Sequence, residues 1–289
     1  MATALGVGLG FKPQHFHEAV AESQHGQWWE IHPENYAVAG GPRLAMLDAL
    51  RAQHPLSLHS VSLSLASPEP LDVHRLQALV DLHHRLQPTL VSEHLAWSWW
   101  QGHYAPDLLP ARRTHFLLHT LLRHIDTLQN ALGRPIALEN PSHYVPLAHE
   151  WDEVEFLNTL ARRSGCQLLV DVNNVAVSAH NLGQDPEDWL DRIAGEHVAE
   201  IHLAGYHPDP LLGEALWIDG HASPIAPNVW ELFDRLVRRI GRRPTLIERD
   251  DDIPPYAELQ AQADHARKML SAMEAPGRAH ALRERVGHV

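Results

Sequence analysis

The sequence predicts an α/β fold of the (β/α)₈ TIM-barrel class, with one barrel domain over residues 1–275. Short apolar or β-branched runs alternate eight times with longer segments of helical period, and no linker rich in Pro, Gly or Ser divides them. Strands that alternate with helices form parallel βαβ units, and eight such units close into a barrel. An open doubly wound sheet is the alternative, but it usually carries a G-x-G-x-x-G turn after its first strand. Here Gly6, Gly8 and Gly10 lie inside the first expected strand and lack that spacing.

Each element follows from its local pattern. The expected strands are GVGLG (6–10), WWEIH (28–32), LSLHS (56–60), TLVSEH (89–94), PIALEN (135–140), QLLVDV (167–172), VAEIHLA (198–204) and PTLIER (244–249). The expected helices lie at about 13–23, 42–53, 72–87, 112–132, 152–164, 186–196, 227–241 and 256–273. Asp72 and Pro227 are helix-start signals, while Gly133 and Gly165 are helix-end signals before the next strand. The polar residues 276–289 are expected to form a loosely ordered tail.

Composition excludes several classes of function. The chain carries 36 acidic and 23 basic residues, and its net charge of −13 argues against a nucleic-acid partner. It has no signal-peptide pattern and no apolar run long enough to cross a bilayer, so a cytoplasmic location without membrane association is expected. A single cysteine, Cys166, excludes an internal disulfide and a multi-thiolate metal site. The 24 histidines favour imidazole for any chemistry at a metal.

Polar residues mark the carboxyl end of one expected strand after another. In strands three to eight these residues are His59, His94, Glu139, Asp171, His202 and Glu248. A TIM barrel gathers these strand ends on one face, which is the face that carries its site. One histidine there is commonly a hydrogen-bonded rim residue, but burying six such groups without partners costs roughly 2 kcal/mol or more each. Their coincidence therefore predicts a shared divalent-metal site.

The loop IDGHASPI (218–225) adds two more donors to the same face. Asp219 and His221 follow strand seven and are expected over the barrel mouth. So many nitrogen and oxygen donors exceed the needs of one ion, which predicts two or three ions with a bridging carboxylate such as Glu139. Imidazole and carboxylate without sulfur suit iron, manganese or zinc. Because side chains alternate along a strand, Glu93 and His94 cannot both face inward without a bulge.

Seven ordered motifs carry a family resemblance. They are SLHSVSLSL, SEHLAWS, LENPS, DVNNVAVSAHN, EIHLAGY, IDGHASPI and LIERDDDIP. In this order they resemble the multinuclear non-haem iron-dependent oxidases, the family of the methanobactin-biosynthesis oxidase and of enzymes that modify peptide cysteines in thiaglutamate-type pathways. The resemblance extends from GVGLGFKP to about Leu270.

The resemblance implies a xylose-isomerase-like barrel with two or three irons in mixed Fe(II)/Fe(III) states and O₂ as co-substrate. It implies a Cys-containing precursor peptide as substrate and a small partner protein that delivers this peptide. The implied metal ligands are His59, His94, Glu139, Asp171, Asn174, His202, Asp219, His221 and Glu248. Glu30, His32 and Asn35 match a further motif that is assigned to the substrate pocket. Cys166 precedes strand six, at the opposite end of the barrel, and is not the reacting thiol.

Two alternatives remain open at this stage. A divalent-metal isomerase or hydrolase on a related barrel would use similar ligands, and a sugar isomerase often has a lysine near its metals, for which only Lys12 is available. A non-enzymatic metal- or peptide-binding protein is the other alternative. Trp97, Trp99 and Trp100 either hold a peptide or pack on the barrel rim.

Overall fold

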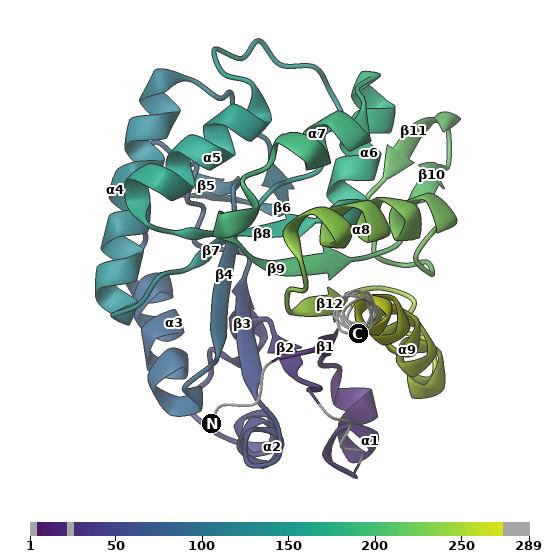
Figure 1. The fold of residues 1–289 in the computed structure, drawn as a ribbon. Coiled ribbons are helices and arrows are strands. Elements are labelled where there is room, and N and C mark those ends of the chain that lie inside the picture. Colours follow the sequence, from purple (N-terminus) through teal and green to yellow (C-terminus); the bar gives the residue numbers. More distant parts are fainter. Residues whose placement is uncertain (1–4, 22–25, 274–289) are drawn as a thin grey trace, which may run out of the picture.

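The computed structural model describes residues 5–21 and 26–273, so the expected tail at 276–289 lies outside the described residues. Within these residues, parallel strands close into a barrel in the order β1-β12-β9-β8-β7-β4-β3-β2, and helices surround it (Figure 1). Each barrel strand falls inside one of the eight predicted ranges, which confirms the (β/α)₈ prediction. The strands are β1 (Val7–Gly10), β2 (Trp29–Ile31), β3 (Leu56–Ser60), β4 (Leu90–His94), β7 (Ala137–Glu139), β8 (Gln167–Asp171), β9 (Val198–Leu203) and β12 (Thr245–Ile247).

Most helices begin and end at the predicted signals. The Asp72 carboxylate accepts the N–H groups of His74 and Arg75 at the start of α3, and Gly133 ends α4 in the left-handed conformation. The helices are α1 (Phe16–Ala21), α2 (Pro42–Arg51), α3 (Val73–Leu86), α4 (His115–Leu132), α5 (Glu153–Ser164), α6 (Val172–Leu182), α7 (Pro186–Arg192), α8 (Pro227–Ile240) and α9 (Tyr256–Ala272). Their apolar faces pack on the barrel and form one hydrophobic core. Within the described residues, no helix combines the length and the apolar character needed to cross a bilayer.

The structure contains three features that the sequence did not predict: one helix and two hairpins. Helix α6 begins directly after β8, because Asp171 is its N-cap and accepts the N–H of Asn174 at 2.7 Å. Asn173 and Asn174, which suit turns, therefore lie in the first turn of a helix. Two hairpins were also absent from the prediction, β5 (Trp97–Trp100) with β6 (His103–Leu109) and β10 (His207–Asp209) with β11 (Gly213–Ile218).

Close packing at strand β1 requires a glycine. A Cβ built on Gly8 would lie 2.5 Å from the ring of Trp28, which is fully buried. We expect Gly8→Ala to lower the free energy of unfolding by about 1–3 kcal/mol, because the core must shift to admit the methyl group. Urea denaturation followed by circular dichroism measures the change.

Gly40→Ala is the matched control, since a Cβ at this exposed position meets no atom within 4 Å. Its free energy of unfolding should stay within about 0.5 kcal/mol of the wild-type value. Equal stabilities of the two variants would contradict the packing that the structure shows at Gly8.

Candidate metal centre

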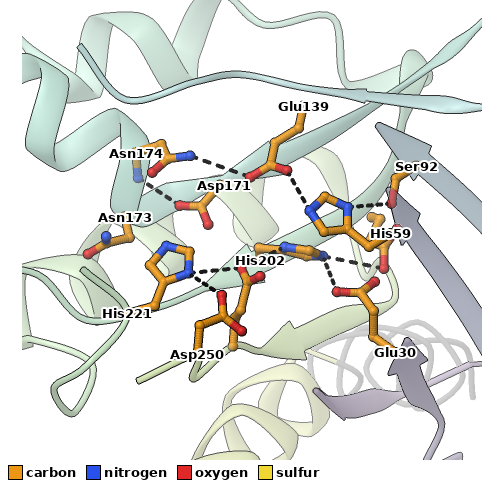
Figure 2. A network of polar contacts seen from close by, with 12 residues as sticks. Glu30, His59, Ser92, Glu139, Asp171, Asn173, Asn174, His202, His221 and Asp250 are labelled. Atoms are coloured by element: carbon orange, nitrogen blue, oxygen red, sulfur yellow. Dashed lines mark hydrogen bonds and ion pairs between the residues drawn. The ribbon is translucent and has the colours of Figure 1, made fainter. Parts of the chain in front are cut away.

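The carboxyl ends of neighbouring barrel strands bring two predicted histidine ligands onto one carboxylate oxygen of a third predicted ligand. His94 of β4 lies in register with Glu139 of β7. The Oε2 atom of Glu139 lies 3.2 Å from His59 Nε2 (Figure 2). The same oxygen lies 3.0 Å from His94 Nε2. The other oxygen, Oε1, lies 3.4 Å from the side-chain amide of Asn174. Glu139 is thus placed between the histidine pair and α6.

The second half of the cluster comes from β8, β9, β12 and the loop after β11. Asp171 lies in register with His202, and His202 Nδ1 lies 3.1 Å from Glu248 Oε2. In the loop, His221 Nε2 lies 2.7 Å from Asp219 Oδ1, and His221 Nδ1 lies 3.5 Å from Glu248 Oε2. His221 has a φ of 47°, a left-handed conformation that a non-glycine residue adopts only where its surroundings hold it.

Hydrogen-bonded neighbours orient three of the histidine rings. The Nδ1 atom of His59 lies 2.8 Å from Ser92 Oγ, that of His94 lies 3.2 Å from the carbonyl oxygen of Ser60, and that of His221 lies 3.2 Å from Asp250 Oδ2. In each ring Nε2 then faces a carboxylate of the cluster. Metal-bound histidines are held in this way, with one nitrogen on an outer acceptor and the other on the ion.

Several buried atoms of the cluster lack a hydrogen-bond partner among the described residues. They are His59 Nε2, Glu139 Oε2, Asp171 Oδ2, Asn174 Oδ1 and His221 Nε2. Buried polar atoms are normally hydrogen-bonded, so a set of orphaned donor atoms around one point indicates a missing partner. Nitrogen and oxygen donors of this kind fit divalent first-row metal ions.

The charges of the cluster perturb one another strongly. Burial alone would raise the pKa of Glu139, but the neighbouring His94 and His59 outweigh it and hold this pKa at about 2. Burial likewise lowers the pKa of His59, yet the carboxylates of Glu30 and Glu139 raise it to about 10. Burial and the carboxylates of Asp219 and Glu139 raise the pKa of Asp171 well above its usual range. Without a cation, the carboxylates of Asp219 and Glu139 therefore repel a negative charge on Asp171.

A cavity of about 190 Å³ opens over these donors. His32, Val61 and Leu108 line it together with six of the predicted ligands. Those ligands are His94, Glu139, Asn174, Asp219, His221 and Glu248. These six predicted ligands therefore face a space that a small group can enter, whereas His59, Asp171 and His202 are fully buried and do not line it.

Comparison with known proteins places the chain in a family. The model of the RiPP precursor modification enzymes MbnB/TglH/ChrH matches residues 6–271. The chain belongs to this family. A family relative, a UPF0276 protein of Caulobacter vibrioides, is 53% identical over 266 residues, which cover 92% of this chain and 95% of that protein.

Solved structures share the fold at low sequence identity. Endonuclease IV from Thermus thermophilus has a TM-score of 0.61 and 17% identity, covering 92% of this chain and 99% of that chain. A xylose isomerase-like TIM barrel protein from Mycobacterium smegmatis, in complex with magnesium, has a TM-score of 0.58 and 11% identity, covering 95% and 98%. At these identities the likeness establishes the xylose-isomerase-like barrel that the resemblance implied.

The three residues assigned to the substrate pocket take different places in this family member. His32 lines the cavity, and Glu30 is buried beneath it, 3.5 Å from His202 Nε2. Asn35 is exposed on the 3₁₀ helix η2 (Pro33–Tyr36), and its carbonyl oxygen accepts a hydrogen bond from Arg43. Asn35 is not among the residues that line the cavity, so its role remains a prediction.

As the alternation of side chains along a strand predicts, Glu93 and His94 do not both face the cavity. The Glu93 carboxyl group accepts the backbone N–H groups of Leu63 and His94 and does not join the cavity lining. Burial and the nearby Glu34 raise the pKa of Glu93 to about 8. Of this pair, only His94 reaches Glu139.

Sequence reasoning missed three residues around the cluster. Glu200 lies on β9 two residues before His202, and Ser92 lies on β4 two residues before His94, so the period of two along a strand was the available signal. Asp250 binds His221 and also pairs with Lys12 at 2.7 Å. It lies in the acidic run Asp250–Asp252, where the sequence alone does not distinguish which side chain turns to the mouth.

Asp171 provides a test of the charge crowding. We expect Asp171→Asn to raise the free energy of unfolding of the metal-free protein by about 0.5–2 kcal/mol at pH 7, since it removes a carboxylate that its neighbours repel. The amide oxygen can still accept the N–H of Asn174. The gain should shrink as pH falls, because the raised pKa lets wild-type Asp171 take up a proton in the folded state. Urea denaturation with a chelator present, at several pH values, measures it.

Asp185→Asn is the control, because Asp185 caps α7 in the same manner at an exposed position. It should leave stability within about 0.5 kcal/mol of wild type at every pH. A loss of stability in metal-free Asp171→Asn would show that the carboxylate is a structural group and not a repelled one.

Labelling of Cys166 tests whether this thiol is accessible in the folded protein. Cys166 is 2% exposed at the start of β8, away from the barrel mouth, and burial raises its pKa to about 11. We expect a thiol reagent to label less than a tenth of the native protein at pH 8 in the time that labels one thiol per chain in urea. Rapid labelling of the native protein would contradict the burial of this thiol.

Proposed function

We propose that this member of the family is an iron-dependent oxidase. In this proposal it holds two or three iron ions in Fe(II) and Fe(III) states and uses O₂ to oxidise a cysteine of a ribosomally made precursor peptide. The observation that carries the proposal is the set of orphaned imidazole, carboxylate and amide atoms at the barrel mouth, where Glu139, Asn174 and His221 line one cavity. The family supplies the peptide substrate class, and the absence of sulfur from the donor set favours iron, manganese or zinc.

Three sets of side chains would hold the ions. Glu139 would bridge, because one of its oxygens faces two histidines and the other faces α6. Two of these sets have ligand atoms within 4.8 Å of one another: His59 with Glu139 and His202, and Asp171 with His221 and Glu248. The third would draw on His94, Asn174 and Asp219. When bound, the iron supplies electron transfer to O₂ and an open position for a thiolate.

The cavity limits what can reach the site. Its volume of about 190 Å³ suits one amino-acid side chain with a small co-substrate and is below the size of ordinary ligand pockets, about 300–1,000 Å³. A peptide would therefore insert its cysteine and leave its flanking residues on the outer surface. Val61, Leu108 and Pro141 would exclude water from the inserted side chain. The small partner protein implied by the resemblance would hold the flanking residues.

One observation favours a second candidate, a metal-dependent isomerase. Lys12, one of two lysines in the chain, lies at the mouth, where it pairs with Asp250 at 2.7 Å. Asp250 in turn binds His221, so the ammonium group is two contacts away from a predicted ligand. An isomerase would need no O₂, which separates the two candidates by experiment.

The proposed activity can be tested with the full chain purified without oxygen and loaded with Fe(II). A Cys-containing peptide encoded beside the gene should change in mass only when O₂ is admitted, with O₂ consumed in parallel. The same peptide with Cys→Ser should not change. Zn²⁺ in place of iron should give no reaction, because zinc does not change its oxidation state. Mass spectrometry and an oxygen electrode measure the outcome.

Glu139→Gln should lower the rate on the order of 100-fold or more, because it removes the proposed bridging carboxylate. Glu153→Gln is the matched control, since Glu153 is a carboxylate with only 12% side-chain exposure that pairs with a histidine, His143, at 2.7 Å, but lies outside the cluster. Conversion without O₂, or equal rates in the two variants, would contradict the proposal.

A further inference from the structure

A layer of buried acid lies one step deeper in the barrel than the proposed metal cluster. Glu200 is 0% exposed and Glu30 is 1% exposed. Because Glu200 precedes His202 by two residues on β9, both side chains point into the barrel, with Glu200 further from the mouth. Both oxygens of Glu200 and the Oε1 atom of Glu30 lack a hydrogen-bond partner among the described residues. Carboxyl groups in a barrel interior are costly, so a polar group must face them.

That group is the ring of His202. Its Nε2 atom lies 3.5 Å from Glu30 Oε1 and 3.6 Å from Glu200 Oε1. Its Nδ1 atom, on the other side of the ring, lies 3.1 Å from Glu248 Oε2 in the cluster. The ring thus connects the cluster with the acidic layer (Figure 2).

His202 is oriented opposite to His59 and His94. Both of these direct Nε2 to Glu139 and Nδ1 to an outer partner. His221 directs Nε2 to Asp219, and its Nδ1 lies 3.2 Å from Asp250 and 3.5 Å from Glu248. A neutral imidazole has one N–H and one lone pair, so it binds a metal ion through one nitrogen only. His202 must therefore present Nδ1 to the ion beside Glu248 and keep its proton on Nε2.

We propose that Glu200, together with Glu30, is a positioning residue that accepts the Nε2 proton of His202 and so fixes its Nδ1 lone pair toward the metal cluster. The inference rests on the proposed function only in requiring a metal ion at the cluster. Ser57 Oγ donates to the Oε2 atom of Glu30 at 2.9 Å, which turns the Oε1 atom of Glu30 toward His202. Glu200 has no such donor among the described residues, which leaves His202 as the group it faces.

A cation held in the acidic layer itself is the competing assignment. Glu30, Glu200 and His202 each offer one ligand atom, and these atoms lie within 4.8 Å of one another. An ion in the acidic layer would bind His202 through Nε2. His202 could then also bind an ion of the cluster only if both ring nitrogens lost their protons. The two assignments differ in the number of ions that the chain binds at saturation.

The test uses the full-length protein and Co²⁺, whose visible absorption reports the ligands around the ion. Glu200→Leu removes the acceptor, and Glu200→Gln keeps a neutral acceptor oxygen of similar size. We expect Glu200→Leu to bind Co²⁺ about 10–100-fold more weakly than wild type, with shifted absorption bands and an unchanged number of ions at saturation. Glu200→Gln should recover most of the affinity, because its amide oxygen can accept the same proton. Glu153→Gln should match wild type in affinity and bands.

Wild-type affinity and bands in Glu200→Leu would overturn the inference. The loss of one ion per chain at saturation would also overturn it, in favour of a cation in the acidic layer, and equal losses in the two Glu200 variants would exclude the hydrogen bond as the cause. If Glu200→Leu does not fold, Glu30→Leu and Glu30→Gln give the same comparison on the second carboxylate. Wild-type protein that binds no Co²⁺ would instead count against the proposed function itself.

Discussion

The site depends on the buried carboxylate of Glu139, which has neighbouring polar side chains at both of its oxygens. Glu139 lies at the end of β7 with two imidazole rings on one oxygen and an asparagine amide on the other. In a low-dielectric interior the attraction of these groups is strong, which is why Glu139 keeps a pKa of about 2 despite burial that acts in the opposite direction. The parallel register of β4 and β7 sets this geometry, so the barrel topology and the chemistry of the mouth are one constraint.

The protein stabilises the cluster from outside. A serine hydroxyl, a backbone carbonyl and an aspartate orient His59, His94 and His221, and the side chain of Asn140 holds the backbone of Asp171 through two hydrogen bonds of 3.0 Å. These partners keep donor atoms in place that repel one another when no cation is bound. The binding geometry is therefore preformed, even though neighbouring carboxylates repel that of Asp171.

Family, fold and cavity describe the protein at different levels of detail. The family establishes modification of a RiPP precursor, and the solved structures establish a xylose-isomerase-like barrel. The cavity of about 190 Å³ adds a size limit, since under the proposed function one side chain and a small co-substrate would fill it. The hairpin β5–β6 follows β4, and the hairpin β10–β11 follows β9. Leu108 of β6 lines the cavity. The peptide-binding surface is therefore expected around the mouth and not within the barrel.

The sequence by itself determined the eight strands, their order and the polar residues at their carboxyl ends, because strand periodicity and the topology of parallel units place those ends on one face. It did not determine Glu200, Asp250 or the exposed position of Asn35, since alternation and turn patterns leave several orientations open. The start of α6 at Asp171 and the two hairpins were also decided by the tertiary structure. So was the reversed ring of His202, because its direction depends on carboxyl groups from β2 and β12 that only barrel closure brings to its two sides.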